Sequence, residues 1–256
     1  AFLAGQNVGF IAKALIVDSP VMFFAFIMLT EPATTPPTKN LQRLYGILTG
    51  ILYAPFVNIF FFYFSPELAL LAGNVFSYVV SPKEKLILTL KEKINIANDT
   101  DDFIFTAEQK FNFKPGQYME WTLGHKQQDD RGIRRYFTIA SSPTEPDLRL
   151  GVKFYPKPSS YKRAMESLQV GQNIVATQLA GDFTMPKDVS KKLIFIAGGI
   201  GVTPFRSMVK YLIDRQEKRN IVFLYASTYG FAYQDIFEQA QQKLGIKTAY
   251  VEGFIT

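Results

Sequence analysis

The pattern of apolar and polar residues changes twice along the chain. In the first part, Leu44–Phe64 is a stretch of 21 residues without a charged side chain, and a second apolar stretch, Leu68–Val80, follows the turn Ser65-Pro66-Glu67. At 1.5 Å per residue, a helix over Leu44–Phe64 is long enough to cross a hydrocarbon core of roughly 30 Å. We therefore predict transmembrane α-helices in residues 1–82.

An earlier apolar segment, Val8–Leu29, is interrupted by Asp18-Ser19-Pro20, which is typical of a helix N-cap with proline in the first turn. This pattern predicts a broken membrane helix. Such helices often line binding sites in addition to spanning the membrane. For Leu44–Phe64 the alternative is a buried helix of a soluble protein. The run Ile59–Phe64 disfavours it, because it is apolar all round and leaves no polar face for water.

From Leu86 the pattern becomes one of short strands, which predicts a small antiparallel β-barrel. The expected strands are Leu86–Leu88, Phe103–Phe105, Tyr118–Leu123, Tyr136–Ala140, Leu148–Tyr155 and Asn173–Gln178. From Lys191 strands (193–197, 221–226, 247–251) alternate with helices (203–217, 232–243), which predicts a parallel, doubly wound α/β sheet. We expect three domains, over residues 1–82, 83–190 and 191–256.

A glycine turn opens the α/β part. After Leu193–Ala197 come Gly198-Gly199-Ile200-Gly201, and Val202-Thr203-Pro204 then begin a helix. Glycines let the backbone come close to phosphates, and a helix N-terminus offers unpaired N–H groups and a positive dipole. The turn therefore predicts a nucleotide diphosphate site. It lacks the full G-x-G-x-x-G spacing, so a purely structural glycine turn stays an alternative.

A second candidate site is the stretch Arg135–Pro143, RYFTIASSP. Arg135 can bind a diphosphate through two parallel hydrogen bonds. Phe137 returns to the same face of the strand and can cover an aromatic ring, whose edge Thr138 can reach. Taken alone, an ordinary wall strand of the barrel is the alternative.

Charge and composition narrow the function. Residues 1–82 carry three basic and three acidic groups, so the net charge of +6 lies in residues 83–256. No arginine-rich helix or aromatic-basic platform accompanies this charge, which argues against nucleic acid and favours a position beside an anionic membrane leaflet. The lack of cysteine excludes disulfides, cysteine-ligated iron–sulfur clusters and thiolate zinc sites. The single histidine, His125, excludes a bis-histidine haem here, and we expect it to be a barrel-loop residue outside any metal site.

The basic residues also predict the topology. Lys39, Arg43, Lys83 and Lys85 lie on one side of the predicted helices, which the positive-inside rule assigns to the cytoplasm. We expect a multi-pass protein of the cell inner membrane with residues 83 onward in the cytoplasm.

Four motifs occur in a characteristic order: Arg135–Pro143, then Lys157-Pro158-Ser159-Ser160, then Gly181-Asp182-Phe183, then GGIGVTP at 198–204. Over about residues 84–256 they resemble the ferredoxin–NADP reductase-like flavoprotein family. The resemblance implies FAD on the barrel and NADH or NADPH on the α/β domain. The residues that it implies for FAD are Arg135, Ser159 and Ser160 at the pyrophosphate, Phe137 and Thr138 at the reacting flavin ring, and Val152 and Phe154 beside the ribityl and adenosine. Those that it implies for the nicotinamide nucleotide are Gly198, Gly199, Gly201, Val202, Thr203 and Ser227.

Two positions depart from the family pattern. Phe137 stands where tyrosine is commoner, and Tyr225–Tyr229 lacks the arginine that NADPH-specific members often have, which favours NADH. The C-terminal part of the family's site lies beyond residue 256.

The N-terminal stretch FFAFIMLTEPATTPPTKNLQRLYGILTG, residues 23–50, resembles the flavin-carrying membrane subunits of the sodium-translocating NADH:quinone reductase and of the Rnf complex. Glu31 replaces the aspartate of those proteins. They carry FMN on a threonine upstream of this motif, so any such FMN lies outside this chain. We expect Thr34, Thr35 and Thr38 to shape the loop instead.

Together these features predict a membrane-anchored oxidoreductase that passes electrons from NAD(P)H through FAD to a membrane acceptor, either a second flavin, a quinone or a partner subunit. Three alternatives stay open: a subunit that moves Na⁺ or H⁺ through the broken helix near Asp18, a ferric-reductase or oxidase-like protein with haem on other helices, and a non-catalytic membrane scaffold. The chain lacks an initiator Met and ends after a third βα repeat has begun, so we expect a fragment open at both ends.

Overall fold

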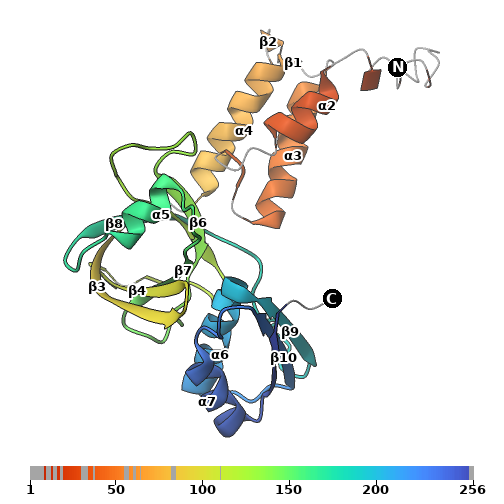
Figure 1. Cartoon of the computed structure of the whole chain (residues 1–256). Helices are drawn as coiled ribbons and strands as arrows, with labels where there is room; N and C mark the ends of the chain where they lie inside the picture. The colour runs from red at the N-terminus through yellow and green to blue at the C-terminus, as the bar shows by residue number, and fades with distance from the viewer. Residues whose placement is uncertain are drawn as a thin grey trace. The chain divides into compact units, whose positions relative to one another are not determined.

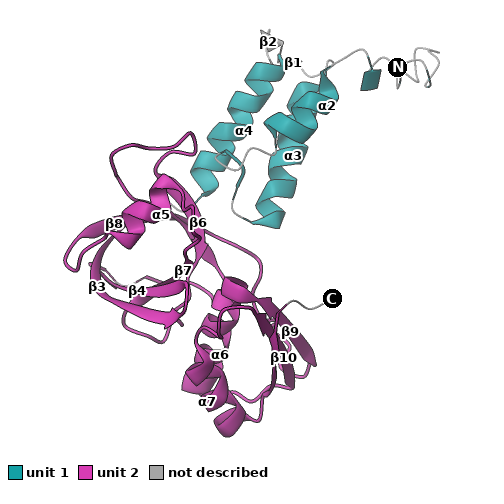
Figure 2. Cartoon of the chain, in the orientation of Figure 1, with its two compact units in different colours: residues 1–82 teal, residues 83–256 magenta. Residues whose placement is uncertain are grey.

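The computed structural model describes residues 9, 13, 16–17, 20–29, 34–36, 38–54, 58–59, 62–63, 65–81, 85–109 and 111–253. By their contacts the residues separate into two compact units, 1–82 and 83–256 (Figures 1 and 2). Each unit is described by itself. The predicted boundary between residues 190 and 191 stays a prediction.

Unit 1 is a pair of packed helices with short flanking elements. It contains α2 (Val21–Phe23), the π-helical turn η2 (Phe24–Met28), α3 (Lys39–Tyr53), the two-residue strands β1 (Asn58–Ile59) and β2 (Phe62–Tyr63), and α4 (Pro66–Val80). Helices α3 and α4 meet closely at Gly73, where a β-carbon would lie 2.3 Å from Thr49 Cγ2. The Tyr45 hydroxyl donates to Asn74 across this contact, at 3.1 Å.

The helix predicted over Leu44–Phe64 is wrong beyond Tyr53. Helix α3 ends there, Ala54 is extended with ψ 129°, and Asn58 pairs with Tyr63 in a short antiparallel ladder. Ala54 precedes a proline, and the proline ring disfavours helical backbone at the residue before it. Among the described residues, no helix is both long enough and apolar enough to cross a membrane.

The second apolar stretch does form a helix. The Ser65 hydroxyl accepts a hydrogen bond from the Leu68 amide, and Pro66 occupies the first turn of α4. In the earlier segment, α2 begins after Pro20, whereas Asp18 and Ser19 lie outside the described residues.

The first half of unit 2 is the predicted antiparallel barrel. Its strands are β3 (Leu86–Ala97), β4 (Thr100–Ala107), β5 (Tyr118–Thr122), β6 (Arg134–Thr138), β7 (Leu148–Lys153) and β8 (Asn173–Ala180), and α5 (Ser160–Glu166) lies between β7 and β8 in the chain. The spatial order is β6-β5-β8-β3-β4-β7, and the sheet curves so that its outer strands approach (Figure 1). The Ala140 amide, just past β6, donates to the Arg149 carbonyl in β7 at 2.9 Å. Trp121, Tyr161 and Phe105 fill the core without exposure.

The second half is the predicted parallel sheet. It contains β9 (Leu193–Gly198), the 3₁₀ turn η3 (Gly199–Val202), α6 (Thr203–Arg215), β10 (Ile221–Ser227), α7 (Gln234–Leu244) and β11 (Lys247–Glu252), with strand order β11-β10-β9. Figure 1 shows α6 and α7 beside each other next to β9 and β10.

Within the described residues, the expectation of a doubly wound sheet needs correction. Helices α6 and α7 share one hydrophobic core with the sheet, whereas Ile194 and Ile196 of β9 are exposed on its other face. Each step from β9 to β10 to β11 moves in the same direction across the sheet. Because such crossovers are right-handed, both helices fall on one face.

Candidate functional site

The glycine turn lies at the carboxyl edge of the parallel sheet. Gly198 ends β9 and pairs with Ala226 of β10, so Ser227 lies beside it at the same edge. Gly199 has φ +50°, a left-handed backbone that favours glycine. A β-carbon at Gly198, Gly199 or Gly201 would meet nothing within 4 Å. The turn therefore borders open space at the edge where open α/β sheets bind ligands.

Two other predicted residues of this turn contribute differently. The Val202 side chain is fully buried in the core of the sheet, so only its main chain can face a nucleotide. The Thr203 hydroxyl donates to the Ile200 carbonyl at 3.2 Å and closes the turn.

The predicted FAD residues form a second cluster, centred on Arg135 in β6. Arg135 Nη2 lies 3.1 Å from Asp129 Oδ1, and its Nη1 donates to the carbonyls of Arg131 and Gly132. Its guanidinium carbon lies 5.2 Å from the centre of the Tyr161 ring. Arg135 is thus held in place by the 129–132 loop and by α5.

Ser159 and Ser160 begin α5 next to this arginine. The Ser159 hydroxyl accepts from the Lys162 amide at 3.3 Å, and the Ser160 amide donates to Asp129 Oδ2 at 3.1 Å. Desolvation acts to raise the pKa of Asp129, but hydrogen bonds from Ser160 and the Arg131 amide, together with the Arg131 charge, lower it to about 2. The site therefore already holds one anion.

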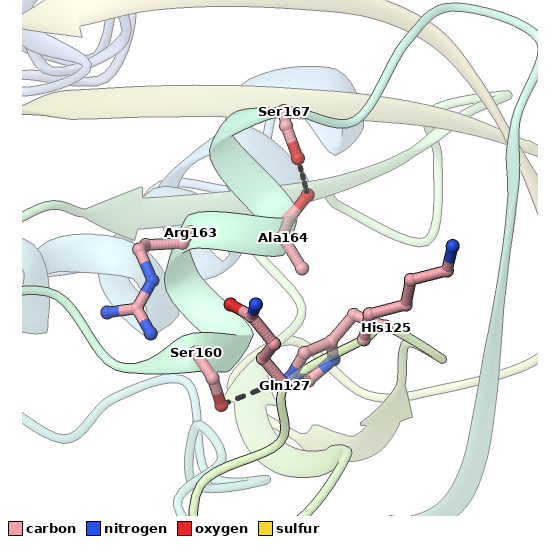
Figure 3. Close-up of a pocket in the computed structure, with 7 residues that line it drawn as sticks. His125, Gln127, Ser160, Arg163, Ala164 and Ser167 are labelled. Carbon is pink, nitrogen blue, oxygen red and sulfur yellow. Dashed lines mark hydrogen bonds between the residues drawn. The ribbon is translucent and has the colours of Figure 1, made fainter.

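His125 lies on the outer side of the same cluster. Its Nδ1 lies 2.8 Å from the Leu123 carbonyl, which can only accept, and its Nε2 lies 3.1 Å from the Ser160 hydroxyl. Figure 3 shows His125, Gln127 and Arg163 around a pocket of about 260 Å³ that Lys126 and Ser160 also line. The prediction that His125 is a loop residue fits this position, although its link to Ser160 was not foreseen.

The remaining barrel residues lie along β6 and β7. Phe137 is half-buried, with its ring centre 5.9 Å from that of Tyr161, and Thr138 pairs with Tyr118 of β5. The Val152 side chain is 1% exposed inside the barrel, so the expected contact with FAD is limited to its main chain. Phe154 follows β7 and packs against Phe103, with 6.3 Å between ring centres.

The structure thus brings the predicted residues together in two groups. Arg135 and Phe137 contact Tyr161 of α5, which follows Ser159 and Ser160 at the start of that helix. The glycine turn and Ser227 lie at the sheet edge. The turn contacts the barrel at Gly151 of β7, beside Val152. Three residues that the sequence did not single out are Asp129, Gly151 and Tyr161. Only Asp129, three residues before Gly132 in a polar loop, carried a charge that hints at its role.

An antiparallel barrel with an arginine-centred anion site is joined to a parallel sheet with a glycine turn, an arrangement suited to holding two nucleotides. Residues 87–184 match the oxidoreductase FAD-binding domain, and residues 195–252 match the oxidoreductase NAD-binding domain. The chain thus carries an oxidoreductase FAD-binding domain followed by an oxidoreductase NAD-binding domain.

Individual relatives match this part of the chain. The glycine betaine monooxygenase reductase subunit of Chromohalobacter salexigens is 33% identical over 132 residues, which are 50% of this chain and 35% of the relative. The flavohemoprotein of Bacillus subtilis is 31% identical over 141 residues, 54% of this chain and 35% of the relative. The chain thus spans about a third of the length of these relatives.

Solved structures share the fold. The FAD/NAD-binding domain of a nitric oxide dioxygenase from Vibrio cholerae superposes with a TM-score of 0.59 at 17% identity, over 69% of this chain and 80% of that one. The cytochrome P450 reductase GcoB of Amycolatopsis gives 0.58 at 21% identity, over 68% of this chain and 53% of that one. At such identities the likeness concerns the fold alone.

Proposed function

We propose that the chain catalyses electron transfer from NADH or NADPH, through FAD, to a further acceptor. The observation that carries this proposal is the presence, in one compact unit, of an anion site on the FAD-binding domain and an open glycine turn on the NAD-binding domain. Bound FAD accepts two electrons as hydride from a stacked nicotinamide, and can release them one at a time. The protein supplies position and electrostatics.

Arg135, Ser159 and the Ser160 amide would hold the FAD pyrophosphate, in place of the Asp129 carboxylate. A carboxylate is an acceptor-only anion, and Arg135 and the Ser160 amide already hold one. The same donors fit a diphosphate, which carries more charge and more acceptor oxygens, and Ser159 adds a hydroxyl at the same helix start. Binding of FAD at these donors would require Asp129 to move aside.

Residues of β6 beyond Arg135 would hold the flavin ring. Arg135 and Phe137 are two residues apart on one face of an extended strand, roughly 7 Å. Phe137 covers the ring and Thr138 reaches its edge, while Phe154 and the main chain of Val152 line the rest of the cofactor. The turn Gly198–Thr203, with Ser227, holds the nicotinamide nucleotide, and the lack of arginine in Tyr225–Tyr229 favours NADH.

Anaerobic titration of the full chain tests this function. With FAD bound, we expect NADH, and NADPH to a lesser degree, to bleach the flavin absorbance near 450 nm. The control is Arg163→Met, which removes a pocket-lining cation that does not contact Arg135 or Asp129 in the structure. Absence of bleaching with both nucleotides in FAD-loaded protein contradicts the proposal.

We further infer that the acceptor is membrane-associated, a second flavin or a quinone, and that unit 1 contacts the inner membrane with unit 2 on its cytoplasmic side. Support comes from the apolar side chains that α3 and α4 expose, among them Ile47 (58%), Leu71 (58%) and Val79 (66%). Isolated water-facing helices seldom carry so many. The full chain is expected to float with phospholipid vesicles in a density gradient. Recovery of all the protein in the lipid-free fraction contradicts this placement.

A further inference from the structure

A buried polar network joins the two halves of unit 2, the barrel (β3–β8) and the parallel-sheet lobe (β9–β11 with α6 and α7). Asp102 of β4 has no exposed surface and receives hydrogen bonds from both sides. Arg149 of β7 lies 2.6 Å from its Oδ2, and the hydroxyl of Tyr233, from the parallel-sheet lobe, donates to its Oδ1 at 2.8 Å. Burial raises the pKa of Tyr233 well above its usual value, and the Asp102 charge adds to this, so the hydroxyl stays a donor.

A second branch comes from α6. Arg206, 3% exposed, donates from Nη2 to Glu145 Oε1 at 2.8 Å and from Nη1 to Glu145 Oε2 and to the Ala140 carbonyl. One residue on, the Ser207 hydroxyl donates to the Ser141 carbonyl at 2.6 Å. Both branches therefore run from the parallel-sheet lobe to the barrel.

A tight steric contact between the halves lies beside this network, at Gly151. Gly151 pairs with Asp102 across β4 and β7. A β-carbon at Gly151 would lie 2.6 Å from the Tyr233 hydroxyl, 3.0 Å from Thr203 Cγ2 and 3.1 Å from Ile200 Cδ1. Because Gly151 has no side chain, the end of the glycine turn packs directly against β7, at the residue before Val152.

The backbone at Tyr233 is unusual. It has φ +60°, a left-handed conformation that is unfavourable for a non-glycine residue. Such a backbone conformation persists only where contacts of the surrounding residues stabilise it. Here the hydroxyl is held by Asp102 and the ring packs in the core of the parallel-sheet lobe, 5.5 Å from the Arg206 guanidinium carbon.

We propose that Asp102, Gly151 and Tyr233, with the Arg206–Glu145 pair, form an interlobe joint that sets the distance between the glycine turn and the flavin-bearing strands. These are positioning residues: they touch neither nucleotide, but they fix where Ile200 and Thr203 stand relative to β7. The inference rests on the proposed function, because its consequence is the spacing between nicotinamide and flavin. Hydride transfer requires the rings in near contact, and a 1 Å misplacement can cost on the order of 100-fold in rate.

The test compares Tyr233→Phe and Gly151→Ala with the matched control Tyr250→Phe in the FAD-loaded full chain. The Tyr250 hydroxyl is buried in the same lobe without a hydrogen-bond partner among the described residues, so its removal leaves the joint intact. Stopped-flow flavin reduction at saturating NADH is expected to slow about 10-fold or more in the two joint variants. FAD content and the half-saturating NADH concentration should stay within about threefold. A purely structural role would instead lower FAD content.

A second readout separates positioning from folding. In the joint variants the deuterium isotope effect with NADH labelled at the transferred position should rise, and the long-wavelength charge-transfer band of the nicotinamide–flavin pair should weaken. A reduction rate, isotope effect and band unchanged from wild type in both variants overturn the proposal. So does an equal loss of rate in Tyr250→Phe.

If neither nucleotide reduces the FAD bound to wild-type protein, the proposed function fails. The interlobe joint is then tested separately, by the hydrogen-exchange rates of backbone amides. The amides of residues 199–203 are expected to exchange faster in Gly151→Ala than in wild type and Tyr250→Phe. Equal exchange in all three proteins overturns the joint by itself.

Discussion

Replacing Glu145 by glutamine should destabilise unit 2 more than any single change on the other side of the same ion pair. Glu145 forms an ion pair with Arg206, and no other carboxylate among the described residues lies within 4 Å of that guanidinium. The side chain of Arg206 is 3% exposed, and its pairing with Glu145 raises the guanidinium pKa against the opposing effect of burial. Glu145→Gln therefore leaves a buried guanidinium charge without its paired carboxylate, although the Ala140 carbonyl still accepts from it, and this loss costs about 3–5 kcal/mol.

Arg206→Met should cost less, although it breaks the same pair. Glu145 keeps the Ser142 amide at 2.6 Å and Arg149 at 3.5 Å, so its charge stays compensated. We expect a loss of about 1–3 kcal/mol, the usual range for a lost hydrogen bond to a charged group. The two losses differ because Glu145 has other donors, Ser142 and Arg149, whereas Arg206 has no second carboxylate within 4 Å among the described residues.

Urea unfolding of the full chain measures both values. Trp121, the only tryptophan, is fully buried in the barrel core and reports on unit 2. With a slope of about 2 kcal/mol/M, a loss of 3 kcal/mol lowers the midpoint by roughly 1.5 M. Glu238→Gln, on the exposed side of α7, is the control and should change stability by about 0.5 kcal/mol at most. Equal losses for Glu145→Gln and Arg206→Met, or a loss below about 1 kcal/mol for the former, refute the reasoning.

Three further predictions concern the two nucleotide sites. Because the folded pKa of Asp129 is lowered from 3.8 to about 2, its contribution to stability is complete above pH 4 and is lost as the pH falls toward 2. The difference in urea midpoint between wild type and Asp129→Asn should therefore close over that interval, and a constant difference contradicts it. Arg135→Met should weaken FAD binding roughly 10- to 100-fold by fluorescence titration, whereas Arg134→Met, which is 64% exposed, should leave it unchanged. Gly199→Val, at φ +50°, should raise the KM for NADH at least several-fold while FAD stays bound, and an unchanged KM contradicts the assignment.

The barrel and the parallel sheet were predictable because the strands and helices of each follow from short-range patterns of apolar and turn residues. Strand Phe103–Phe105 lies within β4, and the helix expected from residue 203 begins there as α6, because apolar periodicity and turn residues act over a few positions. The helix over Leu44–Phe64 was predicted wrongly for a local reason too. The prediction rested on the apolar character of the stretch and neglected the proline that follows Ala54. That proline disfavours helical backbone at Ala54, so α3 ends at Tyr53.

The anion site was predictable in part. Arg135, Ser159 and Ser160 belong to motifs, so the sequence names them, whereas Asp129 emerged only from the structure. Its contact with Ser160 spans 31 residues, and a carboxylate in a polar loop has no periodic pattern to mark it. In the described structure, Asp129 contacts Arg135 and Ser160, the residues that the family resemblance assigns to a phosphate. The sequence therefore named the basic and hydroxyl residues of this cluster but not the carboxylate that contacts them, and their role in binding FAD stays a prediction.

The interlobe joint lay beyond sequence reasoning for a physical reason. Tyr233 and Asp102 are 131 residues apart, and nothing in either local pattern relates them. One signal was present: Asp102 lies directly before the buried run Phe103–Phe105, where a carboxylate without a partner would be costly to bury. Such a residue requires a donor from elsewhere in the fold, and the structure supplies two, one from each half of unit 2. Because Gly151 faces Asp102 in the ladder, the same position that buries the charge also lets the glycine turn come close. The electrostatic and steric parts of the joint therefore depend on each other, and a change at Gly151 should disturb the Tyr233 hydrogen bond even though it alters no polar group.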